Sequence, residues 1–439
     1  MTSNSVSRPL NTANSSLVPM LIIGALFFVF GFVTWLNGAL IPFLQMVCQL
    51  TETQALMVAF CFYVAYVVMA LPAAMVLEKT GYRMGMVIGL ALIALGALLF
   101  VPAALSREFA LFLGAQFIMG SGLTILQTAS NPYIVKIGPE ESAAARIAVM
   151  GLLNKAAGVL APLLFTALVL GDFAHISSAS LAAMTEAERS SQIASMSNGL
   201  VVPYVGMAVV LLLLAGALKL SSLPEISMDD SDTEVADAGS VLQFPQLVLG
   251  AIALFCYVGV EVVAGDTIGL YGSKLGIENA TSLTSLTMFG MVAGYLAGLV
   301  LIPRYLKQQT ALLLSAVLGL LLTALIMFAD PQQQSLSFLW GWAGFSEIPD
   351  VITYVALLGL ANAMVWPSLW PLALTGLGKF TSKGAAVLIM GIAGGAVLPL
   401  GYGLLADNAG SQTAYMIMLP CYLFILYYAV FGYRLRRWG

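Results

Sequence analysis

Charged residues are scarce in this chain of 439 residues. Asp, Glu, Lys and Arg together make up 9% of it, whereas a soluble globular protein carries roughly 25%. Apolar residues reach 60%, and the formal net charge is -4. This composition excludes an ordinary soluble domain and offers no basic surface to nucleic acid. We therefore expect a protein embedded in a lipid bilayer, with no nucleic-acid partner.

Histidine and cysteine are scarce as well. The single histidine and the four cysteines show no metal-binding or redox spacing. Each cysteine lies alone in or beside an apolar stretch, where it acts as a small packing residue. The chain also lacks a nucleophile–base pair and a phosphate-binding loop. We therefore expect neither an enzyme nor a protein that holds a cofactor.

Long apolar stretches are abundant. About 20 apolar residues in a helix cross the ~30 Å hydrocarbon core of a bilayer, because each residue advances 1.5 Å. Twelve such stretches predict an all-α protein with twelve transmembrane helices. The polar first residues lead into a span too long for a signal-peptide core, so we expect that span to remain in the mature protein. The expected spans are 18–46, 54–77, 84–105, 109–136, 144–170, 199–220, 245–271, 283–303, 310–329, 351–376, 383–405 and 413–434.

The basic residues predict the orientation of these spans. If both termini are cytoplasmic, thirteen of the 17 Lys and Arg residues fall on the inner side, and Lys155 lies within a span. Only Arg107, Arg189 and Lys274 then fall on the outer side. Such an asymmetry is typical of the positive-inside rule. We therefore expect both termini in the cytoplasm.

A polar, acidic segment between Ser221 and Phe244 separates six spans from the other six. Its acidic side chains repel one another and bury nothing, which predicts a flexible cytoplasmic linker. The halves also share a weak repeat, in which Met150-Gly151 and Met390-Gly391 both lead on to Gly and Pro. The expected organisation is a cytoplasmic tail at 1–17, a six-helix bundle at 18–220, the linker at 221–244, a second bundle at 245–434 and a tail at 435–439.

The segment "VLEKTGYRMG", between the second and third spans, resembles the cytoplasmic loop motif of the major facilitator superfamily. It carries Glu78, Lys79 and Arg83 around Gly81. An acid at the end of one helix and bases in a tight turn can hold an inner gate in one state and release it in another. Two interpretations stay open: a gating loop, and simple anchoring of the loop by its positive charges.

The stretch "LFCYVGVEVVAGDTIGLY" places Glu261 and Asp266 inside the seventh span. An ionised carboxylate in hydrocarbon costs several kcal/mol unless a partner compensates it. Lys155 lies at a similar depth in the fifth span, which predicts a pair with Glu261. The pair is either structural or exchanged during transport, when Glu261 takes Na⁺ or a proton in place of Lys155. Asp266 lies about 7.5 Å further along the helix, where it extends the ion path or faces an outer vestibule.

Neutral amides and indoles are the other polar groups at mid-depth. Amides both donate and accept hydrogen bonds, which suits a ring of sugar hydroxyls, and indole rings pack on the apolar face of a pyranose. No arginine lies at this depth, which argues against an anionic substrate. Hydrogen bonding between helices is the alternative for any single amide. The expected sugar-binding residues are Asn37, Gln127, Asn131, Asn154, Asn362, Trp366 and Trp370.

The segments "NGALIPF", "QTASNPYIVKIGPEESAAARI", "YVGVEV" and "NAMVWPSLWPLAL" carry a resemblance. They are similar to the fucose/galactose/glucose:cation symporter family of the major facilitator superfamily, and most of all to its bacterial glucose/galactose carriers. The resemblance implies a monomeric carrier in the bacterial inner membrane that works by alternating access. Proton-coupled fucose carriers of this family have acids where this chain has Gly38, beside Asn37, and Gln127. Amides do not titrate, so the departure favours Na⁺ over H⁺.

These observations together predict a symporter that imports glucose or galactose with a cation. Glu261 is the expected Na⁺ site, and Asp266 and Lys155 are expected to take part in coupling. Alternatives are an ion-independent facilitator, an H⁺-coupled fucose-type symporter, and a membrane sensor or scaffold that has lost transport. The mid-depth polar residues argue against the last, because a bundle that transports nothing has little reason to keep them.

Overall fold

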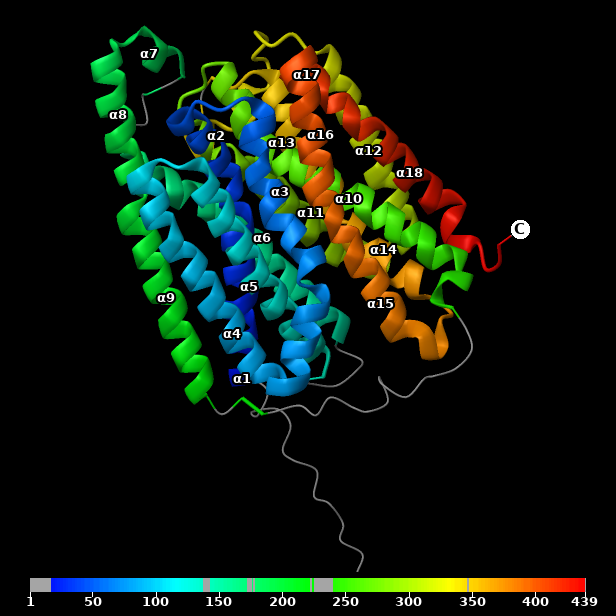
Figure 1. Ribbon diagram of the computed structural model, residues 1–439. Coiled ribbons are helices and arrows are strands. Elements are labelled where there is room, and N and C mark those ends of the chain that lie inside the picture. The colour runs from blue at the N-terminus through cyan, green and yellow to red at the C-terminus, as the bar shows by residue number, and fades with distance from the viewer. Residues whose placement is uncertain are drawn as a thin grey trace, which may run out of the picture.

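The computed structural model describes residues 17–136, 143–171, 176, 178–221, 223–224, 240–345 and 347–438. These residues form helices and short turns and include no β-strand (Figure 1). The tail at 1–16 and residues 225–239 of the expected linker lie outside them. The helices before the linker are α1 (Leu17–Trp35), α2 (Asn37–Cys48), α3 (Glu52–Val68), α4 (Ala70–Ser106), α5 (Phe109–Lys136), α6 (Ala143–Val169), α7 (Ser178–Ala183), α8 (Glu186–Asn198) and α9 (Val201–Leu220).

The second half begins with the longest helix of that half, α10, which carries Glu261 and Asp266. Proline at its first position suits a helix start, where the missing N–H would have no partner within the helix. The helices of this half are α10 (Pro245–Lys274), α11 (Thr284–Arg304), α12 (Gln308–Phe328), α13 (Asp350–Ala363), α14 (Val365–Leu374), α15 (Thr381–Met390), α16 (Gly394–Ala409), α17 (Ser411–Ala414) and α18 (Met418–Val430).

Eleven helical segments of the described chain are long and apolar enough to cross a membrane. The helix α3 is apolar but has only 17 residues. It ends at Val68 because Pro72 has no N–H to donate to the Val68 carbonyl. The second expected span, 54–77, therefore consists of α3 and the start of α4, which turns at the non-helical Gly81 (φ 77°). The expectation of an all-helical membrane protein is confirmed, and the side on which the termini lie stays a prediction.

Proline also divides the span that carries the tryptophan pair. Pro367 has no N–H for the carbonyl of Ala363, and α13 ends at Ala363 before α14 begins at Val365. The proline that follows Asn131 does not interrupt its helix, because α5 continues to Lys136. Proline therefore interrupts one of these two helices and is accommodated in the other.

Large apolar side chains cover much of the outside of the bundle. Leu71, Val202 and Leu213 are 78%, 79% and 68% exposed. Such a surface would aggregate in water, but it matches the hydrocarbon of a bilayer. The hydrophobic residues that remain buried pack between the helices within and across the two halves.

Among the described residues, the main contacts between the two halves are made by three pairs of α-helices. These are α3 with α16, α6 with α11 and α2 with α10. We call the end of the bundle that carries α7, α8 and α17 in Figure 1 the upper end. There Thr166 of α6 is hydrogen-bonded to Thr281, which precedes α11, with 2.7 Å between their hydroxyl oxygens. Lys274 also lies at the upper end, so the basic residues predict that this end is the outer one.

Candidate functional site

A buried ion pair joins the two halves at the middle of their helices. Lys155 lies on α6 and Glu261 on α10, with 2.5 Å between Lys155 Nζ and Glu261 Oε1. The two side chains are 10% and 9% exposed. Tyr257, which is buried, lies one helical turn before Glu261 on α10. Each charge compensates the other, so both are tolerated in this conformation.

The indole of Trp35 lies beside this pair. Lys155 Nζ is 4.6 Å from the ring centroid, a cation–π distance. A Cβ atom on Gly158 or on Gly265 would come within 2.6 Å of the ring, so glycine at both positions lets the indole reach between α6 and α10. We did not expect this role from the sequence. The sequence feature that could have predicted it is the position of Trp35, an indole at the depth of Lys155 and two residues before Asn37.

Asp266 lies five residues after Glu261 on α10, in a different environment. It is fully buried, and neither of its carboxylate oxygens has a hydrogen-bond partner among the described residues. One helix thus carries a carboxylate that is paired and another that is not. A proton or a cation would neutralise the second one, whose charge is costly in this position.

Two buried amides contact each other near the start of α2. Asn37 Oδ1 accepts a hydrogen bond from Gln116 Nε2 of α5 at 2.8 Å. Asn37 Nδ2 and Gln116 Oε1 have no hydrogen-bond partner within the described part of the chain. One donor and one acceptor therefore stay available to a hydroxyl group. Gln116 was missed from the sequence, although it precedes Gln127 by eleven residues, about three helical turns, and so shares its face.

The remaining amides differ in their surroundings. Asn362 of α13 is buried, and its Oδ1 accepts a hydrogen bond from the Tyr422 hydroxyl at 2.8 Å, whereas its Nδ2 has no partner among the residues described. Asn154 is half-buried, with its Nδ2 3.5 Å from the Phe27 carbonyl oxygen. Gln127 is half-buried and Asn131 is exposed. Among these amides, Asn37 and Asn362 are both buried, and each has an Nδ2 without a hydrogen-bond partner among the described residues.

The two tryptophans expected to face a sugar stack on each other. Trp366 and Trp370 of α14 have ring centroids 5.2 Å apart and an interplanar angle of 18°. Both are half-buried. The centroid of Tyr257 lies 6.3 Å from that of Trp366, and Tyr257 lies one helical turn before Glu261 on α10. The aromatic cluster and the ion pair are therefore adjacent.

The loop that resembles a gating motif lies at the opposite end from α17. Glu78 and Lys79 are exposed, and Gly81 supplies the positive φ that turns the chain. Arg83 donates to the Ser221 carbonyl at the end of α9, with 3.2 Å between Nη1 and O. This bond joins the loop to the first residue of the linker and does not reach the second half. The gating role of Glu78, Lys79 and Arg83 stays a prediction.

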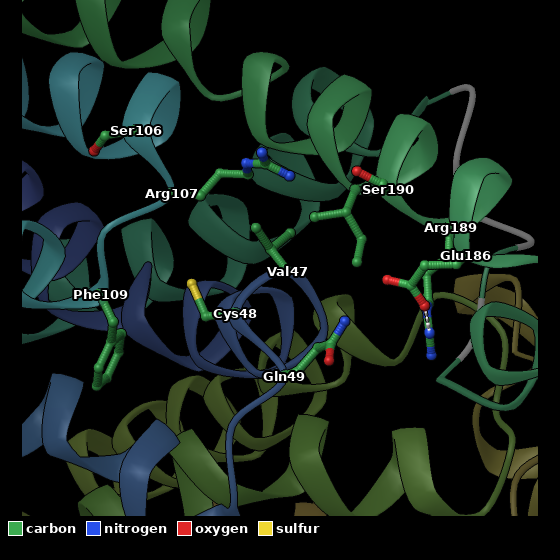
Figure 2. A pocket seen from close by; sticks show the side chains of 10 residues that line it. Val47, Cys48, Gln49, Ser106, Arg107, Phe109, Glu186, Arg189 and Ser190 are labelled. Atoms are coloured by element: carbon green, nitrogen blue, oxygen red, sulfur yellow. Dashed lines mark hydrogen bonds and ion pairs between the residues drawn. The ribbon is translucent and has the colours of Figure 1, made fainter.

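A pocket of about 410 Å³ opens elsewhere, at the upper end of the first half. Figure 2 shows Arg107 and an ion pair between Glu186 and Arg189 of α8 at its sides. None of the residues expected to bind sugar or cation lines it. It therefore belongs to the surface of the first half rather than to the site between the halves.

The amino-acid sequence is similar to those of known transporters. Residues 23–392 match the model of the Major Facilitator Superfamily. A glucose/galactose transporter of Brucella abortus is 33% identical over 98% of this chain and 99% of its own length. The L-fucose-proton symporter of Escherichia coli is 27% identical over 97% of this chain and 95% of its own.

A solved structure shows the same fold. The crystal structure of a variant of the Escherichia coli fucose:proton symporter superposes with a TM-score of 0.69 at 26% identity, covering 95% of this chain and 99% of that one. The match to the family model covers far more than half of the chain. The family expected from the sequence is therefore confirmed: the chain belongs to the major facilitator superfamily and is a membrane transporter.

Proposed function

We propose that this protein imports a hexose, glucose or galactose, by cation symport through alternating access of its two halves. The observation that carries this proposal is the pair of carboxylates on α10, one bound to Lys155 of the other half and one without a partner. The names of the relatives support a sugar as the substrate. The cytoplasmic position of both termini, the bacterial inner membrane and a monomeric state belong to the same proposal.

The ion pair is suited to couple cation binding to the movement of the halves. A buried pair stabilises a fold weakly, because desolvation offsets the attraction, whereas removing one partner costs about 3–5 kcal/mol. Separating α6 from α10 would leave both charges without their partner, and a cation that replaced Lys155 beside Glu261 would remove the part of this cost that falls on Glu261. A cation bound at Glu261 would thus favour the conformation in which the pair is open.

Two cations fit this scheme in different ways. Na⁺ is the ion that the sequence favours, and it would bind between Glu261 and other oxygen ligands. A proton is the second candidate, and the observation in its favour is Asp266, whose oxygens have no partner among the described residues. Imposed gradients of Na⁺ and of pH distinguish the two, because only the coupling ion drives accumulation.

The alternative function is that of an ion-independent facilitator, and the geometry of the ion pair is compatible with it. The contact between Lys155 and Glu261 is short and buried, as in a permanent structural pair. A facilitator equilibrates its sugar but cannot concentrate it. Accumulation against a gradient separates the two functions.

Counterflow tests the substrate independently of the ion. Proteoliposomes loaded with unlabelled glucose or galactose should take up labelled glucose, and those loaded with L-fucose should take up less. The amides and the stacked indoles provide the expected contacts to the hydroxyls and the apolar face of the sugar. If no hexose supports exchange, the proposed substrate class is wrong.

Replacing Trp366 by alanine should raise the KM of counterflow about tenfold, which corresponds to about 1.4 kcal/mol of lost contact with the sugar. The ratio of accumulated sugar at saturating substrate should stay unchanged, because the carboxylates are intact. Trp342→Ala is the matched control, since Trp342 is 66% exposed and lies outside the site. Equal effects of the two substitutions would assign Trp366 a packing role instead.

A further inference from the structure

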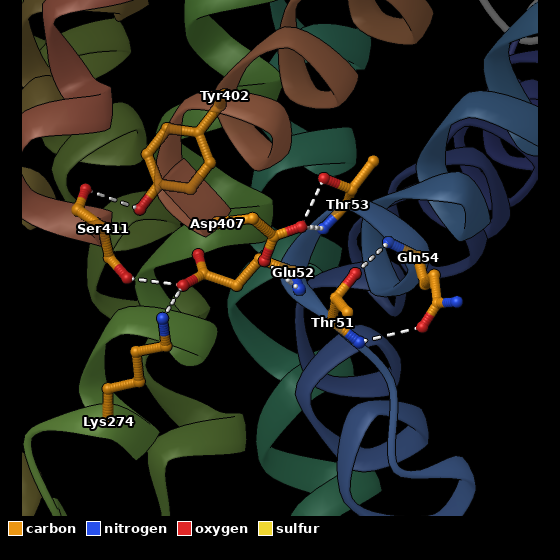
Figure 3. Close-up of polar contacts among 8 residues, drawn as sticks. All are labelled: Thr51, Glu52, Thr53, Gln54, Lys274, Tyr402, Asp407 and Ser411. Carbon is orange, nitrogen blue, oxygen red and sulfur yellow. Dashed lines mark hydrogen bonds and ion pairs between the residues drawn. The ribbon is translucent and has the colours of Figure 1, made fainter. Parts of the chain in front are cut away.

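A polar cluster at the upper end joins the first half to the second. Glu52 is the first residue of α3, and its side chain is almost fully buried. Its Oε1 accepts a hydrogen bond from Ser411 Oγ of α17 at 2.6 Å and forms an ion pair with Lys274 at the end of α10 (Figure 3). A carboxylate of one half is therefore held by two groups of the other.

A second carboxylate makes the reciprocal contact. Asp407 of α16 accepts hydrogen bonds from the backbone N–H groups of Glu52 and Thr53, at 2.9 and 3.0 Å. It also accepts one from the Thr53 hydroxyl at 2.5 Å. The first N–H groups of a helix have no partner within it, and its N-terminus favours negative charge. Figure 3 shows Asp407 of the second half occupying this position on α3.

The backbones around the cluster are packed closely. A Cβ atom on Gly403 of α16 would lie 2.8 Å from Thr53 Cα and 3.1 Å from Leu56 Cδ1. Any side chain at position 403 would push α16 and α3 apart. Glycine here therefore permits the close approach that brings Asp407 to the start of α3. The same approach buries Glu52.

We propose that Glu52, Asp407, Lys274 and Ser411 form a latch that holds the upper end of the carrier closed. The latch is a set of positioning residues: it acts on the access of sugar to the site, and it does not touch the sugar. The inference rests on the alternating access of the proposed function but not on the identity of the sugar or of the ion. With the orientation predicted from the basic residues, the latch closes the outer gate.

The chemistry of the cluster suits a contact that forms and breaks. When the upper end opens, the charges of Glu52, Asp407 and Lys274 move into water, which replaces the lost partners. Hydration therefore offsets part of the cost of breaking these contacts, which suits a contact that opens in each transport cycle. An apolar contact of similar area would gain nothing from opening.

The test measures conformation rather than transport. In a chain whose four cysteines are replaced by alanine, Leu56→Cys introduces a reporter in the α3–α16 contact, where Leu56 is fully buried. A membrane-impermeant maleimide should label it slowly. Adding Glu52→Gln and Asp407→Asn should raise the labelling rate about tenfold or more, because two charge-assisted contacts are weakened.

The control is an acid at the same end whose ion pair lies within one half. Glu186 pairs with Arg189 inside α8, so Glu186→Gln should leave the labelling rate unchanged. An equal rate in the latch variant and in the chain with the reporter alone would overturn the proposal. Because no sugar or ion gradient is present, this outcome is independent of the proposed substrate.

A covalent version of the latch covers the case in which the charge variants fold poorly. Thr53→Cys and Asp407→Cys place two thiols across the same contact. When the two thiols are oxidised to a disulfide, the maleimide should label the Leu56→Cys reporter slowly, and the protein should exchange no sugar. After reduction both labelling and exchange should rise. Exchange that continues in the oxidised, cross-linked protein would show that this end does not open during transport, and the latch would be refuted.

Discussion

Replacing Glu261 by glutamine should abolish the accumulation of sugar that a cation gradient drives, while counterflow exchange persists. Glutamine keeps the shape of the side chain but removes the charge that Lys155 pairs with. Without that charge no cation can take the place of Lys155, so the movement of the halves no longer depends on the ion. The accumulation ratio should fall to one, and it is measured in proteoliposomes with an imposed gradient.

The stability of the same variant tests the pairing itself. Glu261→Gln leaves the Lys155 charge buried without its partner, which should cost about 3–5 kcal/mol of unfolding free energy. The double variant Lys155→Gln, Glu261→Gln should recover most of this loss, because no isolated charge remains. Glu278→Gln is the control, since Glu278 is exposed just beyond α10. If the double variant loses as much unfolding free energy as the two single variants lose together, the pair contributes no coupling energy.

Replacing Asp266 by asparagine should also abolish gradient-driven accumulation, but without loss of stability. The Asp266 carboxylate oxygens have no hydrogen-bond partner within the described structure, so asparagine removes no hydrogen bond seen there. The substitution also removes a charge that is costly to bury. Thermal unfolding in detergent should therefore occur at an unchanged or higher temperature, while transport loses its response to the driving ion.

Asp350 provides the matched control for this prediction. It is another buried acid of the second half, but its Oδ1 accepts a hydrogen bond from the Leu336 N–H at 2.7 Å. Asp350→Asn should lower the unfolding temperature and leave the accumulation ratio unchanged. If Asp266→Asn destabilises the protein in the same way and still couples, Asp266 has a structural role and is not part of the ion path.

The ion pair was open to prediction from the sequence because depth can be counted along a helix. Both spans run in the same direction through an apolar layer of known thickness, so the positions of Lys155 and Glu261 within their spans place them at similar heights. The sequence did not reveal which face of each helix meets the other. That follows from packing, in which Gly158 and Gly265 allow Trp35 to enter.

The latch residues were not open to prediction in this way. Glu52 and Asp407 lie at span ends, where acids are commonly solvated, and no pattern links positions 355 residues apart. Only the close approach of α3 and α16 brings them together. The interruption at Met69 was likewise missed, because the expected span is apolar from Ala55 onward, on both sides of Pro72. Composition is enough to predict that a segment enters the membrane. It is much less informative about the position at which the helix of that segment breaks.

Sugar uptake under three imposed conditions tests the central claim most directly. Proteoliposomes are given a Na⁺ gradient, a pH gradient or neither, and labelled glucose is followed for the wild type and for Glu261→Gln. We expect accumulation above equilibrium in the wild type under a cation gradient, with Na⁺ the favoured ion, and equilibration alone in Glu261→Gln. Uptake that only equilibrates under every gradient, and that the substitution leaves unchanged, would contradict symport and leave a facilitator with a structural ion pair.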